Sequence, residues 1–110
     1  DLDGVFCGND QMAIGALKST EKNMEKKIPE DIKLMGYDDV FLASVVEPSL
    51  STIHIRKGHA GIEAAKILFQ RIEEQDEKYH DAVGIKMNAR LVVRKSTVKD
   101  APEDWNLVDW

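Results

Sequence analysis

The chain has 110 residues, of which 43% are hydrophobic and 32% charged, and its formal net charge is -5. This length allows one compact unit with a modest core. The acidic balance, without a cluster of Lys and Arg, disfavours binding of this chain by itself to a nucleic-acid backbone. The single cysteine, Cys7, excludes a disulfide framework within one chain, and no apolar run approaches the roughly 20 residues that span a bilayer.

The first 40 residues predict a strand, a helix and a second strand. Residues 4–8 form a short apolar run between glycines, which is typical of a strand buried on both faces. Residues 11–23 carry apolar side chains at helical spacing, and residues 32–37 form a second short apolar run after a turn that contains proline. Connections this short imply parallel pairing of the strands, so we expect an α/β fold in which helices flank a parallel sheet.

The rest of the chain predicts one long helix and two further strands. The helix is expected at residues 57–75, where apolar side chains recur every three or four positions. Residues 85–93 alternate between apolar and polar side chains, as in a half-exposed strand at a sheet edge. The other expected elements are a helical turn within 40–47, a strand at 50–55 and an acidic tail at 99–110 that is extended or loosely docked.

A first polar pair, Asn9 and Asp10, follows the first predicted strand. Open α/β sheets bind their ligands where parallel strands end and helices begin. The amide offers both a donor and an acceptor and the carboxylate accepts, a combination that suits vicinal hydroxyl groups. Capping of the following helix explains the same two residues equally well.

A second polar pair, Asp38 and Asp39, follows the second predicted strand. If strand geometry persists, the two side chains point to opposite faces, so that one faces the crevice while the other holds the following loop. An acidic turn without a ligand is the alternative interpretation. A metal site is disfavoured because no further carboxylate lies close by in the sequence.

The sequence offers little for catalysis. His54 and His59 are five residues apart, and neither lies in a known nucleophile motif, while His80 lies in a polar turn. The sequence has no phosphate-binding loop, no glycine motif for dinucleotides and no zinc-ligand spacing. We therefore expect a protein that is not an enzyme, with no cofactor and no metal.

Six segments, taken in order, resemble the carboxyl-terminal part of lactose-repressor/galactose-repressor (LacI/GalR) transcription regulators. They occur in the family's order and at near-normal spacing over residues 4 to 97. The resemblance implies part of the periplasmic-binding-protein-like type I fold, within the effector domain of a cytoplasmic regulator that contacts DNA only through an amino-terminal helix-turn-helix domain outside this chain. The segments are residues 4–17 (GVFCGNDQMAIGAL), 28–32 (IPEDI), 34–39 (LMGYDD), 48–53 (PSLSTI), 61–65 (GIEAA) and 91–97 (LVVRKST).

The resemblance also implies positions for the effector-binding residues. Asn9 and Asp38 lie where the family commonly contacts its small-molecule effector, and Asp10 is a secondary candidate that caps the helix equally well. Ile55 and Lys57 lie at the crossover between the two lobes, where family members place polar or aromatic effector contacts. Ile55 departs from that pattern.

The resemblance further implies a homodimer, because the family places residues 12–22 and 43–47 near a subunit interface. Glu25 stands where the family has a glycine that ends the helix, so we expect that helix end to be built differently. Apolar faces that the family packs against its amino-terminal lobe would be exposed in this chain alone, which predicts self-association. The expected divisions are residues 1–54 as part of the carboxyl-terminal effector-binding lobe, 55–97 as the crossover, helix and strand shared with the amino-terminal lobe, and 98–110 as a carboxyl-terminal tail.

The expected function is effector sensing by a bacterial regulator whose lobe movement controls operator affinity. A sugar or sugar phosphate is the leading effector class, with a purine or another small metabolite as the other possibility. The alternative function is a sugar-binding protein of a transport system, which shares the two-lobed fold. The segments at 28–31 and 91–97 favour the regulator.

Overall fold

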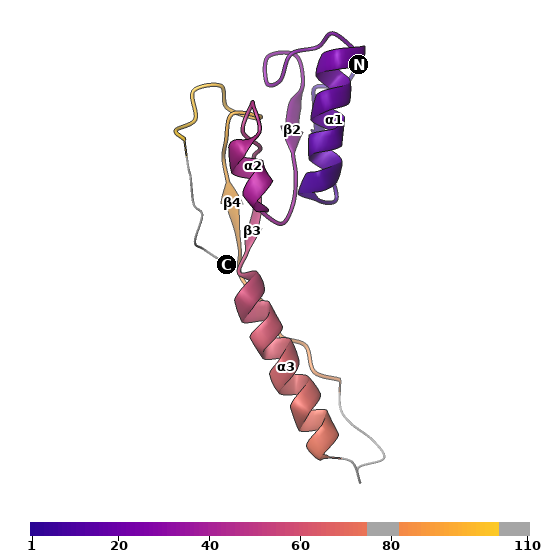
Figure 1. Cartoon of the computed structure of the whole chain (residues 1–110), viewed down its shortest axis with the longest axis vertical. Helices are drawn as coiled ribbons and strands as arrows, with labels where there is room; N and C mark the ends of the chain where they lie inside the picture. Colours follow the sequence, from indigo (N-terminus) through magenta and orange to yellow (C-terminus); the bar gives the residue numbers. More distant parts are fainter. Residues whose placement is uncertain (75–81, 104–110) are drawn as a thin grey trace.

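The computed structural model describes residues 1–74 and 82–103. The molecule measures 61 × 30 × 18 Å, because one long helix extends away from the part that holds the other elements (Figure 1). The expected α/β fold is confirmed. In chain order the elements are β1 (Gly4–Phe6), α1 (Asp10–Asn23), β2 (Lys33–Met35), α2 (Phe41–Val45), β3 (Thr52–Ile55), α3 (Lys57–Glu73) and β4 (Ala89–Val92).

The first three strands run in the same direction. β1 and β2 pair in parallel, and two isolated parallel bridges, Met35 with Ser51 and Asp38 with His54, place β3 beside β2. β4 pairs with β3 in the antiparallel direction. The predicted parallel sheet is therefore confirmed for β1 and β2, and the carboxyl ends of β1, β2 and β3 lie along one edge of the molecule.

The core lies between α1 and the strands. The buried face of α1 contributes Ala13 and Leu17, whereas Met12 on the other face is 62% exposed, as the helical spacing predicts. The prediction that the first strand is buried on both faces is wrong, because β1 is covered on one side only: Val5 packs against the core and Phe6 is exposed. The full cluster of buried apolar residues is Ala13, Leu17, Ile28, Leu34, Ala43 and Leu50.

Several elements are shorter than the sequence predicts. β2 and β3 lack the outer residues of the expected segments, and β4 comprises only Ala89–Val92 of the expected 85–93. The length of β4 is limited by its partner, since β3 supplies four residues for pairing. In the tail, Ala101 is buried, and residues 104–110 lie outside the described part of the chain, as does the end of the helix predicted to reach residue 75.

Because glycine is replaced by Glu25, we expect the end of α1 to be built differently from the family's, but its backbone keeps the glycine-type conformation. Glu25 has φ 53°, the left-handed conformation that glycine normally supplies at this position. The N–H groups of Met24 and Lys26 both donate to the carbonyl of Thr20, each at 3.3 Å. These bonds close the helix in the usual glycine-type geometry, but with a side chain at the strained position.

The substitution Glu25→Gly is expected to raise the free energy of unfolding by about 1 kcal/mol, because glycine carries no Cβ that disfavours the left-handed backbone. Urea denaturation measures this change. Glu25→Ala serves as the control, since it removes the charge but keeps the Cβ, and it should give no such gain. A loss of stability in Glu25→Gly would show that the helix does not end this way.

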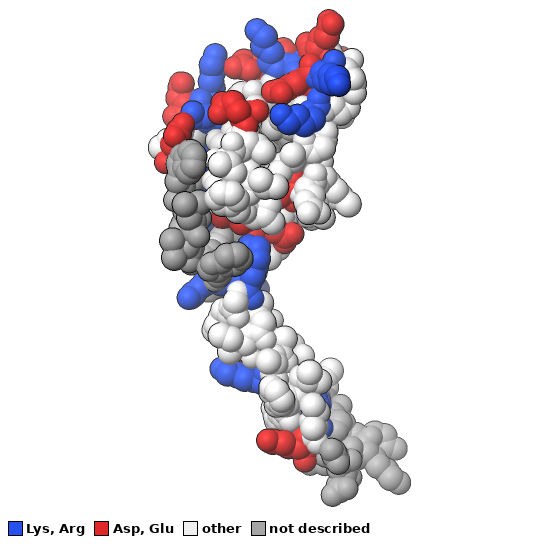
Figure 2. All heavy atoms as spheres, in the orientation of Figure 1, with Lys and Arg blue, Asp and Glu red and all other residues white. Residues whose placement is uncertain are grey.

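The long helix α3 has no buried residue. Its apolar side chains, predicted from their spacing, are present but uncovered: Ile62, Leu68, Phe69 and Ile72 are between 49% and 64% exposed. In Figure 2 uncharged side chains cover most of the visible surface of the narrow lower part, where α3 lies. Among the described residues, neither α3 nor any other helix combines the length and the apolar character needed to span a membrane.

Candidate functional site

Asn9 begins α1 at the carboxyl end of β1. Its Oδ1 accepts a hydrogen bond from the N–H of Met12 at 2.9 Å, so the capping role expected for the pair belongs to Asn9. The side chain is half-buried. Within residues 1–74 and 82–103, no hydrogen bond involves its Nδ2 group. Asn9 therefore caps the helix and still offers two N–H donors at the strand-end edge.

Asp10 does not cap the helix, because Asn9 is the N-cap residue. The sequence left helix capping and effector binding equally open for Asp10, and the capping alternative is wrong. Asp10 is fully buried. Its Oδ1 accepts from the hydroxyl of Thr52 at 2.6 Å, and its Oδ2 accepts from the N–H of Val40 at 2.8 Å. Burial raises the pKa of Asp10, while these two hydrogen bonds oppose that rise. Both oxygens are thus engaged inside the protein.

Gly36 makes room for Asp10. A Cβ atom built on Gly36 would collide with Oδ1 of Asp10 and would lie 3.1 Å from a methyl carbon of Leu50. A side chain at this position would therefore force the buried carboxylate or the backbone to move. The glycine in β2's continuation allows α1 and the sheet to approach closely.

Asp38 follows β2 and keeps its carboxylate available. Its N–H donates to the carbonyl of Ile53 at 3.0 Å, which ties the backbone to β3. The side chain is half-buried. Among the described residues, the carboxylate of Asp38 takes part in no hydrogen bond and no ion pair. It is an acceptor that remains unused at the same edge as Asn9.

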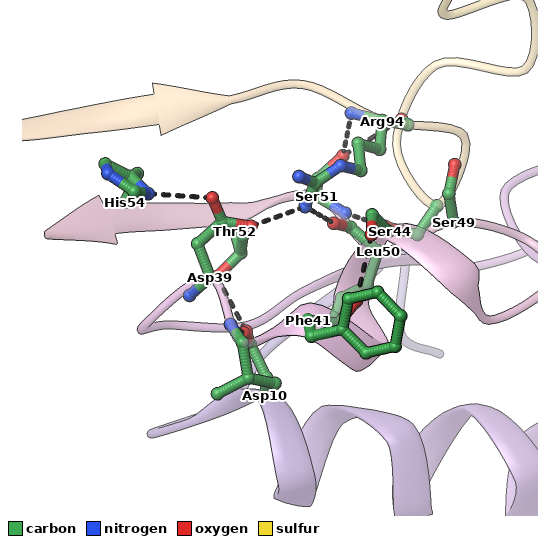
Figure 3. A network of polar contacts seen from close by, with 12 residues as sticks. Asp10, Asp39, Phe41, Ser44, Ser49, Leu50, Ser51, Thr52, His54 and Arg94 are labelled. Carbon is green, nitrogen blue, oxygen red and sulfur yellow. Dashed lines mark hydrogen bonds and ion pairs between the residues drawn. The ribbon is translucent and has the colours of Figure 1, made fainter. Parts of the chain in front are cut away.

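Asp39 holds the following loop, as predicted for one member of the acidic pair. Its Oδ1 lies 2.8 Å from Nη1 of Arg94, and its Oδ2 lies 2.8 Å from Nδ1 of His54 (Figure 3). Burial by itself raises the pKa of this carboxyl, but the hydrogen bonds and charges of Arg94 and His54 outweigh that effect, so the pKa of Asp39 is lowered. Asp39 joins β2 to β3 and to the segment after β4.

The sequence did not predict the partners of these carboxylates. Arg94 is 2% exposed and donates from Nη1 also to the carbonyl of Leu50 at 3.0 Å. Ser51 donates from its hydroxyl to the carbonyl of Arg94 at 2.9 Å, and the hydroxyl of Ser96 accepts from the N–H of Ser51 at 2.8 Å. Arg94 and Ser96 each lie more than 40 positions from Leu50 and Ser51 in the sequence, so the fold brings the two groups together. Leu50, Ser51, Arg94 and Ser96 lie within the family-like segments 48–53 and 91–97, whereas the partners His54 and Val40 lie outside both.

Ile55 and Lys57 lie at the carboxyl end of β3 and the start of α3. Both are half-buried, and Nζ of Lys57 lies 3.4 Å from the carbonyl oxygen of Ile55. The bridge between Asp38 and His54 sets this end of β3 beside the end of β2. The N–H of Asp10 donates to the carbonyl of Tyr37 at 3.0 Å, which sets the start of α1 beside the end of β2. The fold therefore brings the predicted residues to neighbouring strand ends.

A family model, related sequences and solved structures all place the chain among related proteins. Residues 2–97 match the family model of the periplasmic binding protein-like domain. The HTH-type transcriptional repressor PurR of Pasteurella multocida is 42% identical over 93 residues, which cover 84% of this chain and 26% of that protein.

Two solved structures are similar over most of the chain. A transcriptional regulator of the LacI family from Sanguibacter keddieii superimposes with a TM-score of 0.78 at 34% identity, over 87% of this chain and 36% of that one. The transcriptional regulator CelR in complex with cellobiose gives a TM-score of 0.76 at 30% identity, over 87% of this chain and 28% of that one.

The α/β fold with its mixed sheet defines a domain of the periplasmic-binding-protein-like class. The chain belongs to this family and, within it, to the LacI/GalR regulators, as the six family-like segments predict. It spans about a quarter of the length of the curated relative that it matches.

Proposed function

We propose that the chain is the effector-sensing part of a cytoplasmic LacI/GalR-type regulator that binds a sugar or sugar phosphate. The observation that carries this proposal is the pair of unused polar groups at one edge: the Nδ2 donors of Asn9 and the carboxylate acceptor of Asp38. A donor and an acceptor at the same edge suit neighbouring hydroxyl groups. The bound cellobiose in the similar CelR structure supports a carbohydrate.

Ile55 and Lys57 extend the proposed site along the same edge. Ile55 supplies apolar surface for a sugar ring, and the ammonium group of Lys57 attracts an anionic substituent such as a phosphate. Asp10 supports the site from inside the protein, since both of its oxygens are already engaged. The remainder of the regulator would supply DNA contacts, which the HTH-type name of the PurR relative supports.

A thermal-shift screen on the full-length regulator tests the proposal. The compounds are D-glucose, cellobiose, D-glucose 6-phosphate, adenine and guanine. The effector should raise the melting temperature, since ligand at 100 times its Kd stabilises the folded state by about 2.7 kcal/mol. Asp38→Ala should abolish the shift, and the control Asp100→Ala, at an exposed position, should retain it. An intact shift in Asp38→Ala would remove Asp38 from the site.

The lobe assignment is also proposed here. Residues 1–54 would belong to the carboxyl-terminal lobe, 55–97 to the crossover and elements shared with the amino-terminal lobe, and 98–110 to a tail. Movement of the two lobes would then change operator affinity. The uncovered apolar side chains of α3 support a packing partner in the rest of the regulator.

The lobe assignment makes a prediction about the 110-residue chain by itself. Because the apolar side of α3 is uncovered, the isolated chain should form a dimer or larger species in light scattering. The full-length regulator should form a homodimer through residues 12–22 and 43–47, where Met12 and Val45 are exposed. A clean monomer of the 110-residue chain at high concentration contradicts the assignment of α3 to a missing interface.

A further inference from the structure

We propose that Thr52, Asp39 and Arg94 are positioning residues that hold the turn at 38–40 so that Asp38 presents its carboxylate at the strand-end edge. The inference rests on the proposed function, in which Asp38 contacts the effector. It assigns a separate role to the second residue of each polar pair: Asn9 and Asp38 face the ligand, while Asp10 and Asp39 fix the backbone behind them.

The turn needs such support because its backbone is strained. Asp38 has φ 111° and Asp39 has φ 57°. Positive φ values are sterically disfavoured for residues that carry a Cβ, and two in succession persist only where the surroundings hold them. The strain lies directly at the candidate effector residue.

Three successive N–H groups of the turn donate to fixed acceptors. The N–H of Asp38 donates to the carbonyl of Ile53 at 3.0 Å. The N–H of Asp39 donates to the hydroxyl oxygen of Thr52 at 3.3 Å. The N–H of Val40 donates to Oδ2 of Asp10 at 2.8 Å. The acceptors come from β3 and α1, so the turn is held from two sides.

Thr52 connects these acceptors. Its hydroxyl accepts from the N–H of Asp39 and donates to Oδ1 of Asp10 at 2.6 Å, and the side chain is fully buried. A single hydroxyl therefore links the turn, β3 and α1. Valine has nearly the same shape but can make neither bond, whereas serine keeps both.

The carboxylate of Asp39 also fixes the turn, in addition to the bonds of the turn's N–H groups and of the Thr52 hydroxyl. His54 on β3 and Arg94 after β4 each lie 2.8 Å from one of its oxygens (Figure 3). With both oxygens engaged, Asp39 cannot turn toward a ligand, and the peptide that carries Asp38 is fixed relative to β3 and β4. These are the strands on either side of α3 in the chain.

Hydrogen exchange of the full-length regulator, without any ligand, tests whether these hydrogen bonds fix the backbone of the turn at 38–40. Thr52→Val should speed exchange of the amides of Asp39 and Val40 by at least about tenfold. Thr52→Ser should stay within about twofold of the parent, as should Glu30→Gln, a control that removes the exposed contact of Glu30 with Lys99 at 3.4 Å. Asp39→Asn provides a second variant and should speed exchange at the same amides. Unchanged exchange in both test variants overturns the inference.

A double-mutant cycle tests whether the hold acts through Asp38. Titration calorimetry uses whichever of the five screened compounds gives the largest thermal shift. Thr52→Val should weaken its affinity by about tenfold in the parent, but by less than about twofold in the Asp38→Asn background. Thr52→Ser should restore the parent affinity. Equal losses in both backgrounds would mean a general structural effect and overturn the positioning role.

The hydrogen-exchange and calorimetry experiments distinguish a failure of the positioning role from a failure of the proposed function. If none of the five compounds binds the folded parent, the proposed effector classes fail. The exchange arm then decides the inference alone: accelerated exchange in Thr52→Val with rescue by Thr52→Ser supports it, and unchanged exchange refutes it.

Discussion

Arg94→Met is expected to lower the free energy of unfolding by about 3–5 kcal/mol at neutral pH, since it removes one partner of a buried ion pair. The carboxylate of Asp39, whose side chain is 9% exposed, would lose Arg94 and keep His54 as its partner among the described residues. The carbonyl of Leu50 would also lose its donor. Lys95→Met, at the next residue, removes an exposed pair with Glu103 at 3.5 Å and should change stability by less than about 1 kcal/mol.

The loss in Arg94→Met should depend on pH in a defined direction. The pKa of Asp39 is lowered below 3.8 in the folded protein, so its ionised form contributes stability that is present above pH 3.8 and is lost as the pH falls through the folded-state pKa. Urea denaturation from neutral to acidic pH should therefore show a deficit that shrinks in acid. A constant deficit would mean that packing, and not the charge pair, causes the loss.

Asp10→Ala is expected to lower the free energy of unfolding by about 2–4 kcal/mol, because one fully buried and one partly buried donor each lose their acceptor. The donors are the N–H of Val40 and the hydroxyl of Thr52. Asp10→Asn is the matched control, since it keeps one acceptor oxygen in nearly the same volume and should lose about half as much. Equal losses in the two variants would contradict the hydrogen-bond explanation.

The pH dependence of Asp10→Ala should have the opposite sign. Burial raises the folded-state pKa of Asp10 above 3.8, so the stability contributed by Asp10 is full below pH 3.8 and is partly lost as the pH rises through the folded-state pKa. The deficit of Asp10→Ala should thus grow in acid, where that of Arg94→Met shrinks. Parallel pH profiles for the two variants would contradict the different environments of these carboxylates.

The pattern of neighbouring residues in the sequence was sufficient to predict where β1 and β2 end and that Asn9 and Asp38 follow them. The apolar runs before Asn9 and Asp38, and the helix signals after Asn9, depend on neighbouring residues in the sequence. Glu25 is a counterexample, since its residue type predicts a different helix end, whereas its backbone adopts the left-handed conformation that glycine normally supplies. Alternation along an extended chain predicts that one residue of the pair Asp38 and Asp39 holds the loop, but the premise of strand geometry is wrong, because their φ values are 111° and 57°.

Partners distant in the sequence could not be predicted in the same way. Asp10 is a good helix cap by residue type, and its burial depends on Thr52 and Val40, which lie 42 and 30 positions away. Arg94 alternates with apolar neighbours like an exposed strand residue, yet it is buried because Asp39 receives it. The exposure of Phe6 likewise depends on β1 being covered on only one side, which no local pattern records.

The most direct test is a crystal structure of the full-length regulator with the compound that stabilises it in the thermal screen. Hydroxyl oxygens of that compound should lie within about 3.2 Å of Nδ2 of Asn9 and of a carboxylate oxygen of Asp38. A ligand bound elsewhere, with both side chains left in solvent or pointing away from each other, would contradict the placement of the effector at this edge of the sheet.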